Sequence, residues 1–259
     1  KTFTGLSKGT TYTIKVYVKD TNGVDSAVKT TSAETESEIF LADVCSNGTN
    51  LATCIKNYYN EAGSDMSSMY YHTSSLANSA ADNSYRYAGA SPNNYVCFGS
   101  TASTCPSGNL YRIIGVFGSE VKLIKATSYG SYVWNSGNSN TWDRSTKPSI
   151  RSTLNTTFLN TISATWQNKI ATHTWKVGGM AYNNSYTAKQ YYDVEVGSSS
   201  SSTTDPMKIG LMYVSDYGFA ASNSYWTMRL YDYDSATSSN WLYLGSNEWT
   251  IARDSDYSD

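Results

Sequence analysis

Residues 110–125 read LYRIIGVFGSEVKLIK, and this stretch decides the fold class that the rest of the chain has to fit. Two apolar segments flank Phe117-Gly118-Ser119, and each is short enough to be a strand rather than a helix. Glycine beside a small polar residue favours a turn. Val121 and Leu123 then recur at every second position, as side chains do on one face of a strand. The stretch therefore predicts a β-hairpin.

Two cysteines, Cys97 and Cys105, stand directly before this hairpin, eight positions apart in YVCFGSTASTCPSGN. A second close pair, Cys45 and Cys54, lies upstream. Neither spacing is typical of zinc ligands, which favours disulfides over a metal site or free thiols. We predict no metal site and no cofactor. Structural disulfides in turn indicate an exported protein.

Four cysteines allow three pairings, and the sequence leaves the connectivity open, although the local pairing carries a geometric condition. If Cys45 and Cys54 lay in one helix, a rise of 1.5 Å per residue would put them roughly 13 Å apart, too far for a disulfide. Cys45 is therefore expected before the helix, with SNGT turning the chain back. A bridge from Cys97 to Cys105 needs only a hairpin-like loop.

The composition combines 23 tyrosines and 7 tryptophans with only 15% charged residues and a net charge of −2. Tyr and Trp have a large apolar body and a polar tip, which suits β-rich walls and contact surfaces. Without a cluster of Lys and Arg, the chain has no electrostatic footprint for nucleic acid or an anionic membrane. No apolar run approaches the roughly 20 residues of a membrane span. We expect the export signal and the anchor to lie outside this sequence.

Towards the N-terminus, residues 12–18 alternate between apolar and polar side chains, which predicts a strand with one buried face. Asn22-Gly23 is a strong hairpin signal, and residues 27–33 can return as the second strand. This part resembles the last hairpin of a fibronectin type III or similar immunoglobulin-like domain, where Tyr12 would cap the loop from Leu6. The implied domains are the end of such a domain at 1–33, a linker at 34–44 and a disulfide-clipped domain at 45–259.

Three segments carry helical patterns. Residues 51–59 place apolar side chains at i, i+3, i+4, i+7 and i+8, which predicts a helix of about 12 residues. Residues 147–162 keep four apolar side chains on one stripe behind Pro148, which suits a first helical turn. Residues 163–171 predict a short helix that begins at a capping serine.

Most of the remaining apolar segments are short and rich in aromatic residues, which favours strands. Residues 196–206 read as a low-complexity loop, and residues 63–84 fit either a helix or an irregular loop. Strands with a few helices segregated among them predict the α+β class. The predicted strands are residues 85–89, 93–100, 173–179, 207–221, 224–234, 240–245 and 248–253.

Residues 85–259 resemble a bacterial family in the order of their motifs. The order is LYRIIGVFGSEVKLIK, then Trp134 and Trp142, then IRSTLNTTFLNTI, KIGLMYVSDYGFA and YWTMRLYD. It is similar to DUF6273-type domains of surface proteins from Firmicutes and related gut bacteria. The resemblance implies a C-type-lectin-like fold with short aromatic strands and two or three helices.

The sequence holds none of the common catalytic motifs, such as H-E-x-x-H, G-x-S-x-G or a P-loop. Its densest aromatic group instead lies in residues 225–249, interleaved with Arg, Asp and Asn. Aromatic faces stack on sugar rings or protein side chains while the polar groups orient the ligand, although a hydrophobic core is the alternative interpretation. The predicted ligand-binding residues are Tyr225, Arg229, Tyr231, Asp232, Tyr233, Asp234, Trp241 and Tyr243.

Parity and carboxylate spacing add two expectations. In a strand at 225–231, the odd-numbered side chains would be exposed and the even-numbered ones buried. Asp232 and Asp234 would share one face of that strand, where they can bind Ca²⁺ or act as an acid/base pair. Solvent-exposed charges are the simpler explanation for both, and for Asp254, Asp256 and Asp259.

These features predict a protein of the bacterial cell surface that binds without catalysis, an adhesin for a glycan or a protein on a host or neighbouring cell. The alternative is a structural repeat unit of a surface filament or stalk, which would self-associate. A carbohydrate hydrolase rests only on the carboxylates. Nucleic acid and membrane insertion are not expected.

Overall fold

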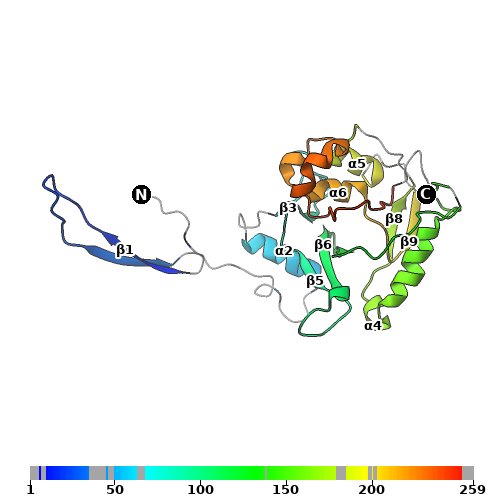
Figure 1. Ribbon diagram of the computed structural model, residues 1–259, viewed down its shortest axis with the longest axis horizontal. Coiled ribbons are helices and arrows are strands. Elements are labelled where there is room, and N and C mark those ends of the chain that lie inside the picture. The colour runs from blue at the N-terminus through cyan, green and yellow to red at the C-terminus, as the bar shows by residue number, and fades with distance from the viewer. Residues whose placement is uncertain are drawn as a thin grey trace. The chain divides into compact units, whose positions relative to one another are not determined.

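The computed structural model describes residues 6, 10–34, 45, 50–62, 68–137, 139–178, 185–197, 200 and 203–252. Contacts along the chain divide it into two compact units, Lys1–Asp65 and Met66–Asp259. The second domain was expected to begin at residue 45, but residues 45–65, which include the helix that follows Cys45, fall in the first of these units. The second unit mixes helices with antiparallel sheets and so belongs to the α+β class (Figure 1).

The first unit contains the predicted hairpin, formed by β1 (Thr11–Val16) and β2 (Lys29–Glu34) in antiparallel pairing. Gly23 adopts a φ of 84°, which is why glycine suits the turn at its tip. The Asp20 carboxylate accepts hydrogen bonds from the backbone N–H groups of Asn22 and Val24 at 2.8 and 2.9 Å. The Asn-Gly turn is therefore confirmed.

The expected buried face of this hairpin is wrong in its second half. Tyr12 and Ile14 are half-buried, but Val16 and Val18 are exposed, and Val18 lies beyond the end of β1. Two strands make too small a sheet to cover an apolar face. The linker expected at 34–44 lies outside the described residues apart from Glu34, as do residues 7–9 of the expected corner between Leu6 and Tyr12.

Helix α2 (Leu51–Ala62) is the predicted 12-residue helix. The side chain of Asn50 accepts a hydrogen bond from the backbone N–H of Thr53 at 2.9 Å, which satisfies one free donor of the first turn. Cys45 stands outside the helix and forms a disulfide with Cys54, and their Cα atoms are 5.1 Å apart. The structure thus shows the local pairing for these cysteines and confirms that Cys45 precedes the helix.

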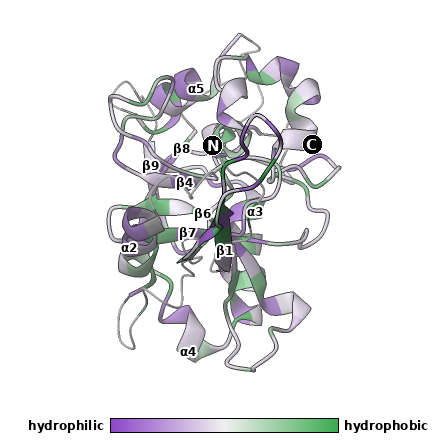
Figure 2. Ribbon diagram, turned by 90° about the vertical axis from the view of Figure 1, so that its left-hand side faces the viewer, coloured by the Kyte–Doolittle hydropathy of each residue, from purple (hydrophilic) through white to green (hydrophobic). Residues whose placement is uncertain are grey.

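A five-stranded antiparallel sheet forms the centre of the second unit. The predicted hairpin of residues 110–125 is confirmed as β6 (Leu110–Phe117) and β7 (Glu120–Lys125). Along its other edge, β6 pairs with β4 (Tyr85–Tyr87) at one end and with β5 (Tyr95–Cys97) at the other. Strand β3 (Met69–Tyr71) completes the sheet beside β4. The ribbon around β6 is coloured as hydrophobic, whereas α5 shows hydrophilic positions (Figure 2).

The pairing of β6 with β7 shifts register between Ile113 and Gly115. A Cβ atom on Gly115 would lie 2.3 Å from the backbone oxygen of Tyr85, so the close approach of β4 requires glycine here. The other two cysteines also pair locally, as the disulfide Cys97–Cys105. It ties the end of β5 to the loop before β6.

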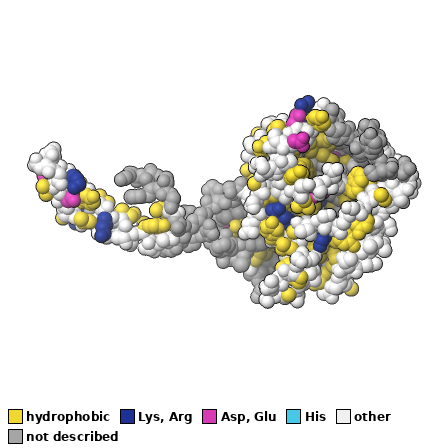
Figure 3. All heavy atoms as spheres, viewed as in Figure 1, with side chains coloured by type: hydrophobic (Ala, Val, Ile, Leu, Met, Phe, Trp, Pro, Cys, Tyr) yellow, Lys and Arg dark blue, Asp and Glu magenta, His cyan; other side chains and the backbone are white. Residues whose placement is uncertain are grey.

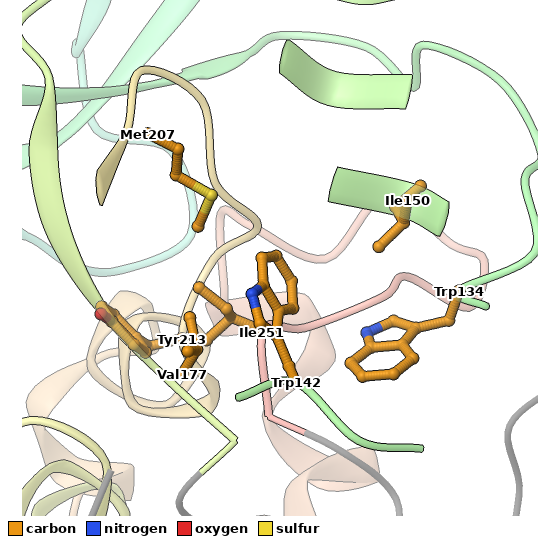
Figure 4. Packing of buried hydrophobic residues seen from close by; sticks show 7 residues of the cluster. All are labelled: Trp134, Trp142, Ile150, Val177, Met207, Tyr213 and Ile251. Atoms are coloured by element: carbon orange, nitrogen blue, oxygen red, sulfur yellow. The ribbon is translucent and has the colours of Figure 1, made fainter. Parts of the chain in front are cut away.

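A smaller sheet pairs β8 (His173–Val177) with β9 (Thr203–Met207). The prediction that residues 196–206 form a loop is wrong for Thr203 to Pro206, which belong to β9. Pro206 is tolerated because β9 is an edge strand. Beside these strands lies the tryptophan-rich core in Figure 4, where Trp142 lies between Trp134 and Ile251 in the view; its members are Trp134, Trp142, Ile150, Val177, Met207, Tyr213 and Ile251.

The segment 147–162 is helical as predicted, but not a uniform α-helix. It runs through α3 (Ser149–Ser152), a π-helical stretch η3 (Thr153–Phe158) and a 3₁₀ turn η4 (Leu159–Thr161). The apolar side chains of this segment recur every four residues and contribute to two core clusters. Ile150 packs in the cluster of Trp142, and Phe158 packs in the cluster of Tyr111. Helix α4 (Ala164–Gln167) follows, and the side chain of Ser163 makes no capping hydrogen bond.

Two helices pack together where strands or nothing had been predicted: α5 (Ala188–Glu195) and α6 (Val214–Ala220) (Figure 1). The strand predicted at 207–221 is wrong beyond Met207. The carboxylate of Glu195 accepts hydrogen bonds from the backbone N–H groups of Val214 and Ser215 at 2.9 and 3.0 Å, so a residue distant in sequence caps α6.

The aromatic strands predicted at 224–234, 240–245 and 248–253 are also wrong. The chain instead forms 3₁₀ helices η5 (Asn223–Tyr225) and η6 (Leu230–Ser239), then turns with isolated bridges. The segment left open at 63–84 contains β3 and, from residue 72, tight turns with Asn78, Ala81 and Asn83 at positive φ. No helix in the described part of the chain is long and apolar enough to cross a membrane.

Candidate functional site

Two of the predicted ligand-binding residues, Tyr233 and Trp241, are core residues. The Tyr233 hydroxyl donates to the backbone oxygens of Gly218 and Tyr225, both at 3.2 Å, and burial raises the pKa of this phenol. The Trp241 indole donates to the backbone oxygen of Tyr87 at 2.9 Å. Their polar tips are satisfied internally, so Trp241 holds the C-terminal segment on β4 and Tyr233 connects η6 to α6 and η5.

The other six predicted residues reach the surface. Tyr231, at 64% exposure, is the most open of them, and Tyr225 and Asp232 are half-buried. Arg229 and Asp232 form an ion pair with Nη2 and Oδ2 2.7 Å apart, so each neutralises the other. The burial parity expected for 225–231 holds in outline, although 3₁₀ and turn geometry produces it rather than a strand.

The carboxylate pair expected on one strand face does not form. Asp232 and Asp234 both lie in η6, where residues two positions apart point in different directions because the helix has three residues per turn. Within the described ranges, no group of three or more His, Cys, Asp or Glu side chains is placed to hold a metal ion. Asp254, Asp256 and Asp259 lie outside those ranges.

The structure brings together a different set of exposed aromatic side chains, which we call the aromatic platform: Tyr129, Tyr132 and Trp249. Their exposed fractions are 38%, 41% and 38%. Tyr129 and Tyr132 come from the loop after β7, and Trp249 comes from the last described segment. The Trp249 indole donates to the backbone oxygen of Tyr132 at 2.7 Å, which joins the two segments.

Buried neighbours in the same two segments explain why the platform is exposed and yet fixed. Two positions after Tyr132 comes Trp134, and two positions after Trp249 comes Ile251; both of these side chains are buried in the tryptophan-rich core. The Trp134 indole donates to the backbone oxygen of Thr250 at 3.2 Å. Each segment therefore places one buried side chain in the core, two positions after an exposed ring, and this buried side chain anchors the segment.

The two tyrosines of the platform are held by ring contacts. Their planes differ by 15° and their centroids are 5.7 Å apart. Phe158 packs edge-on against Tyr129 with centroids 4.7 Å apart. Loss of solvation and the neighbouring Tyr132 raise the pKa of the Tyr129 phenol, so this hydroxyl stays neutral at physiological pH.

The surroundings of the platform are polar but carry few charges. The loop 126–133 reads ATSYGSYV and contains no ionisable group except its two phenols. In the space-filling view, hydrophobic patches lie among uncharged side chains on the visible face of the second unit, with few charged groups between them (Figure 3). Such a surface favours a neutral ligand over a strongly charged one.

No protein-family model, curated protein or solved structure matches the chain.

Sequence reasoning missed Tyr129 and Tyr132 because it sought aromatic density near the C-terminus. A weaker signal was present: Tyr132 lies two positions before Trp134 in a charge-free loop, and Trp249 lies two positions before Ile251. Side chains two positions apart share one face of a regular strand, so this spacing does not identify the exposed ring of each pair. It does not show that the two loops meet.

Proposed function

We propose that residues 66–259 form a non-catalytic, extracellular binding module whose aromatic platform binds a neutral carbohydrate. The observation that carries this proposal is the hydrogen bond from Trp249 to the Tyr132 backbone, which orders exposed aromatic rings before any ligand arrives. Tyr and Trp offer large, rigid contact area at a small cost in conformational entropy. Ordering in advance removes part of the entropic cost of binding.

A saccharide suits the chemistry of the platform. Pyranose rings have apolar C–H faces that pack on aromatic rings. The hydroxyls of Tyr129 and Tyr132, and those of the serines beside them in sequence, can form hydrogen bonds with sugar hydroxyls. The absence of formal charge in loop 126–133 favours an uncharged ligand. A protein ligand would also use aromatic anchors, but a charge-poor surface offers it little electrostatic guidance.

The extracellular setting is supported by the two disulfides, since such bridges form and persist in oxidising compartments. The motif order that resembles DUF6273-type domains supports a C-type-lectin-like fold for this module on a bacterial surface protein. The β1–β2 hairpin then represents an immunoglobulin-like spacer.

The test is a glycan array that contains neutral and acidic oligosaccharides, followed by titration of the retained glycans. Trp249→Ala should weaken binding about tenfold, equivalent to about 1.4 kcal/mol. Tyr231→Ala is the matched control, because this tyrosine is exposed on η6 away from the platform segments in sequence. Retention of no glycan at millimolar concentration, or equal loss in both variants, contradicts the proposal.

A structural role is the second candidate, and exposed apolar side chains on the first unit favour it. Val16, Val18, Val24 and Val28 are all exposed around the β1–β2 hairpin. Two-stranded sheets present open edges that another chain can extend. Sedimentation tests this role: concentration-dependent assembly supports it, and a monodisperse monomer at high concentration contradicts it.

A further inference from the structure

A compact group of buried charges, none of them part of the aromatic platform, lies where β4, β7, α5 and α6 meet. It comprises Arg86, Lys122, Glu195 and Asp216. Arg86, Glu195 and Asp216 are at most 3% exposed, and the Lys122 side chain is 16% exposed. The Lys122 ammonium nitrogen contacts Asp216 Oδ2 directly. Charges this deeply buried are expensive to desolvate, so their arrangement calls for an explanation.

The surroundings of Lys122 favour a neutral amine. Its Nζ lies 4.4 Å from the ring centre of Tyr213 and 5.0 Å from that of Trp175. Burial lowers the pKa of Lys122, and the neighbouring Asp216 opposes this effect without reversing it. A desolvated lysine is a nucleophile because its neutral form carries a free electron pair.

The carboxyl group of Asp216 is held in a fixed orientation in front of this amine. Its Oδ2 accepts a hydrogen bond from the backbone N–H of Tyr213 at 2.9 Å. Its Oδ1 faces Arg86 Nη1 at 3.4 Å. A guanidinium at that position stabilises negative charge that develops on Oδ1 when a nucleophile adds to the carboxyl carbon.

Glu195 supplies a third group, close enough for its charge to interact with those of Lys122 and Asp216. Its carboxylate accepts the backbone N–H groups of Val214 and Ser215, which anchors it at the start of α6. Burial is the main reason that the pKa of Glu195 is raised to about 7, and the nearby Asp216 adds to the rise. A carboxyl group with such a pKa can both accept and return a proton near neutral pH.

We propose that Lys122 and Asp216 condense to an intramolecular amide, with Glu195 as the proton relay. Lys122 Nζ adds to Asp216 Cγ, the Nζ–Cγ bond forms, and Oδ1 remains as the amide oxygen beside Arg86. The Cγ–Oδ2 bond breaks, and Oδ2 leaves as water with two protons that originate from the ammonium group, one of them carried by Glu195. The ammonium and carboxylate thereby become one amide and one water, so no oxidant or other reactant is needed.

The charges of the site fit this product. Arg86 also pairs with Asp82 at 2.7 Å, so these two ions neutralise each other after the condensation. Condensation removes the other buried ion pair and with it the cost of keeping that pair out of water. The new bond would connect β7 to α6 across 94 residues of sequence and, unlike the disulfides, would resist reductants.

The test is the intact mass of the full chain under denaturing, reducing conditions. We expect wild type 18 Da below the mass calculated from its sequence, because one water is lost. Lys122→Arg cannot form this amide and should show its full calculated mass, whereas Glu195→Gln should show a mixture when freshly purified. Since mass is read on unfolded protein, the wild-type measurement does not depend on how well a variant folds.

Peptide mapping separates the amide from other losses of water. Trypsin should fail to cleave after Lys122 and should release a branched peptide that contains Asp216. A wild-type chain with its full calculated mass overturns the proposal, and so does an 18 Da loss that persists in Lys122→Arg, because that loss would come from a succinimide elsewhere.

Discussion

Trp249 donates its indole N–H to the backbone oxygen of Tyr132, 2.7 Å away, although 117 residues separate the two in sequence. This single bond turns two surface loops into one aromatic surface. Trp134 and Ile251, two positions further along these segments, are both buried in the tryptophan-rich core. Exposed aromatic rings that are fixed by buried neighbours form a preorganised contact surface and are not simply the result of incomplete packing.

Replacement of Trp249 should separate binding from stability. In Trp249→Phe the ring remains but the hydrogen bond to Tyr132 is lost, so affinity for a retained glycan should fall less than in Trp249→Ala. Unfolding free energy should drop by only about 1 kcal/mol in Trp249→Phe, the net value of one hydrogen bond. Titration and thermal unfolding of both variants check this. A large loss of stability with unchanged affinity would assign Trp249 to the core instead.

Trp142 should be the residue on which the second unit depends most. It is 1% exposed, and its indole donates to Asp205 Oδ2 at 3.0 Å. Trp142→Ala should cost about 3–5 kcal/mol, because it leaves a cavity and removes a donor from a buried carboxylate. Chemical denaturation measures the loss. Tyr231→Ala should stay within about 0.5 kcal/mol of wild type, and similar losses in both variants would contradict the assigned core.

Glu195 should make stability depend on pH. Its folded pKa of about 7 lies above its ordinary value of 4.5, so the folded state binds more protons between these values. The unfolding free energy should therefore fall as pH rises from about 4.5 to about 7 and then level off, by up to about 3 kcal/mol. The charged groups of Lys122 and Asp216 belong to the same buried cluster as Glu195. Denaturation at several pH values checks the slope, which Glu195→Gln should flatten; an unchanged slope in that variant contradicts the assignment.

The Cys97–Cys105 disulfide should stabilise the second unit mainly through the unfolded state. The two cysteines are eight positions apart, and closing so short a loop removes entropy from the unfolded chain that corresponds to about 2–3 kcal/mol. The double variant Cys97→Ser/Cys105→Ser should lower the unfolding free energy by that amount without altering β6 or β7. Denaturation of wild type with and without reductant gives a second measurement. No change in either experiment would show that the bridge adds little constraint.

Local signals in the sequence predicted a good part of the fold. Helix α2, the β6–β7 hairpin and the Asn22-Gly23 turn depend on patterns within about 20 residues, and all are present. Helix α5 also had a readable start, because Thr187 and Gln190 form a capping box, but the signal was missed.

Tertiary contacts explain what the sequence did not predict. Residues 214–220 look like part of a strand, yet Glu195 from α5 caps them as a helix. Residues 224–245 have the aromatic content of strands, but the indole of Trp241 and the hydroxyl of Tyr233 bond distant backbone oxygens and hold the chain in 3₁₀ turns. Of the predicted site, Tyr233 and Trp241 proved to be anchors. The platform required a contact between loops that no local pattern shows.

The most direct test of the binding proposal is the NMR signal of the Trp249 indole N–H, assigned by its disappearance in Trp249→Phe. When a neutral oligosaccharide retained on the array is added, this signal and the backbone signals of residues 129–133 should shift together and saturate at one dissociation constant. Shifts confined to η6 around Tyr231, or no shift at millimolar sugar, would contradict a carbohydrate site at the aromatic platform.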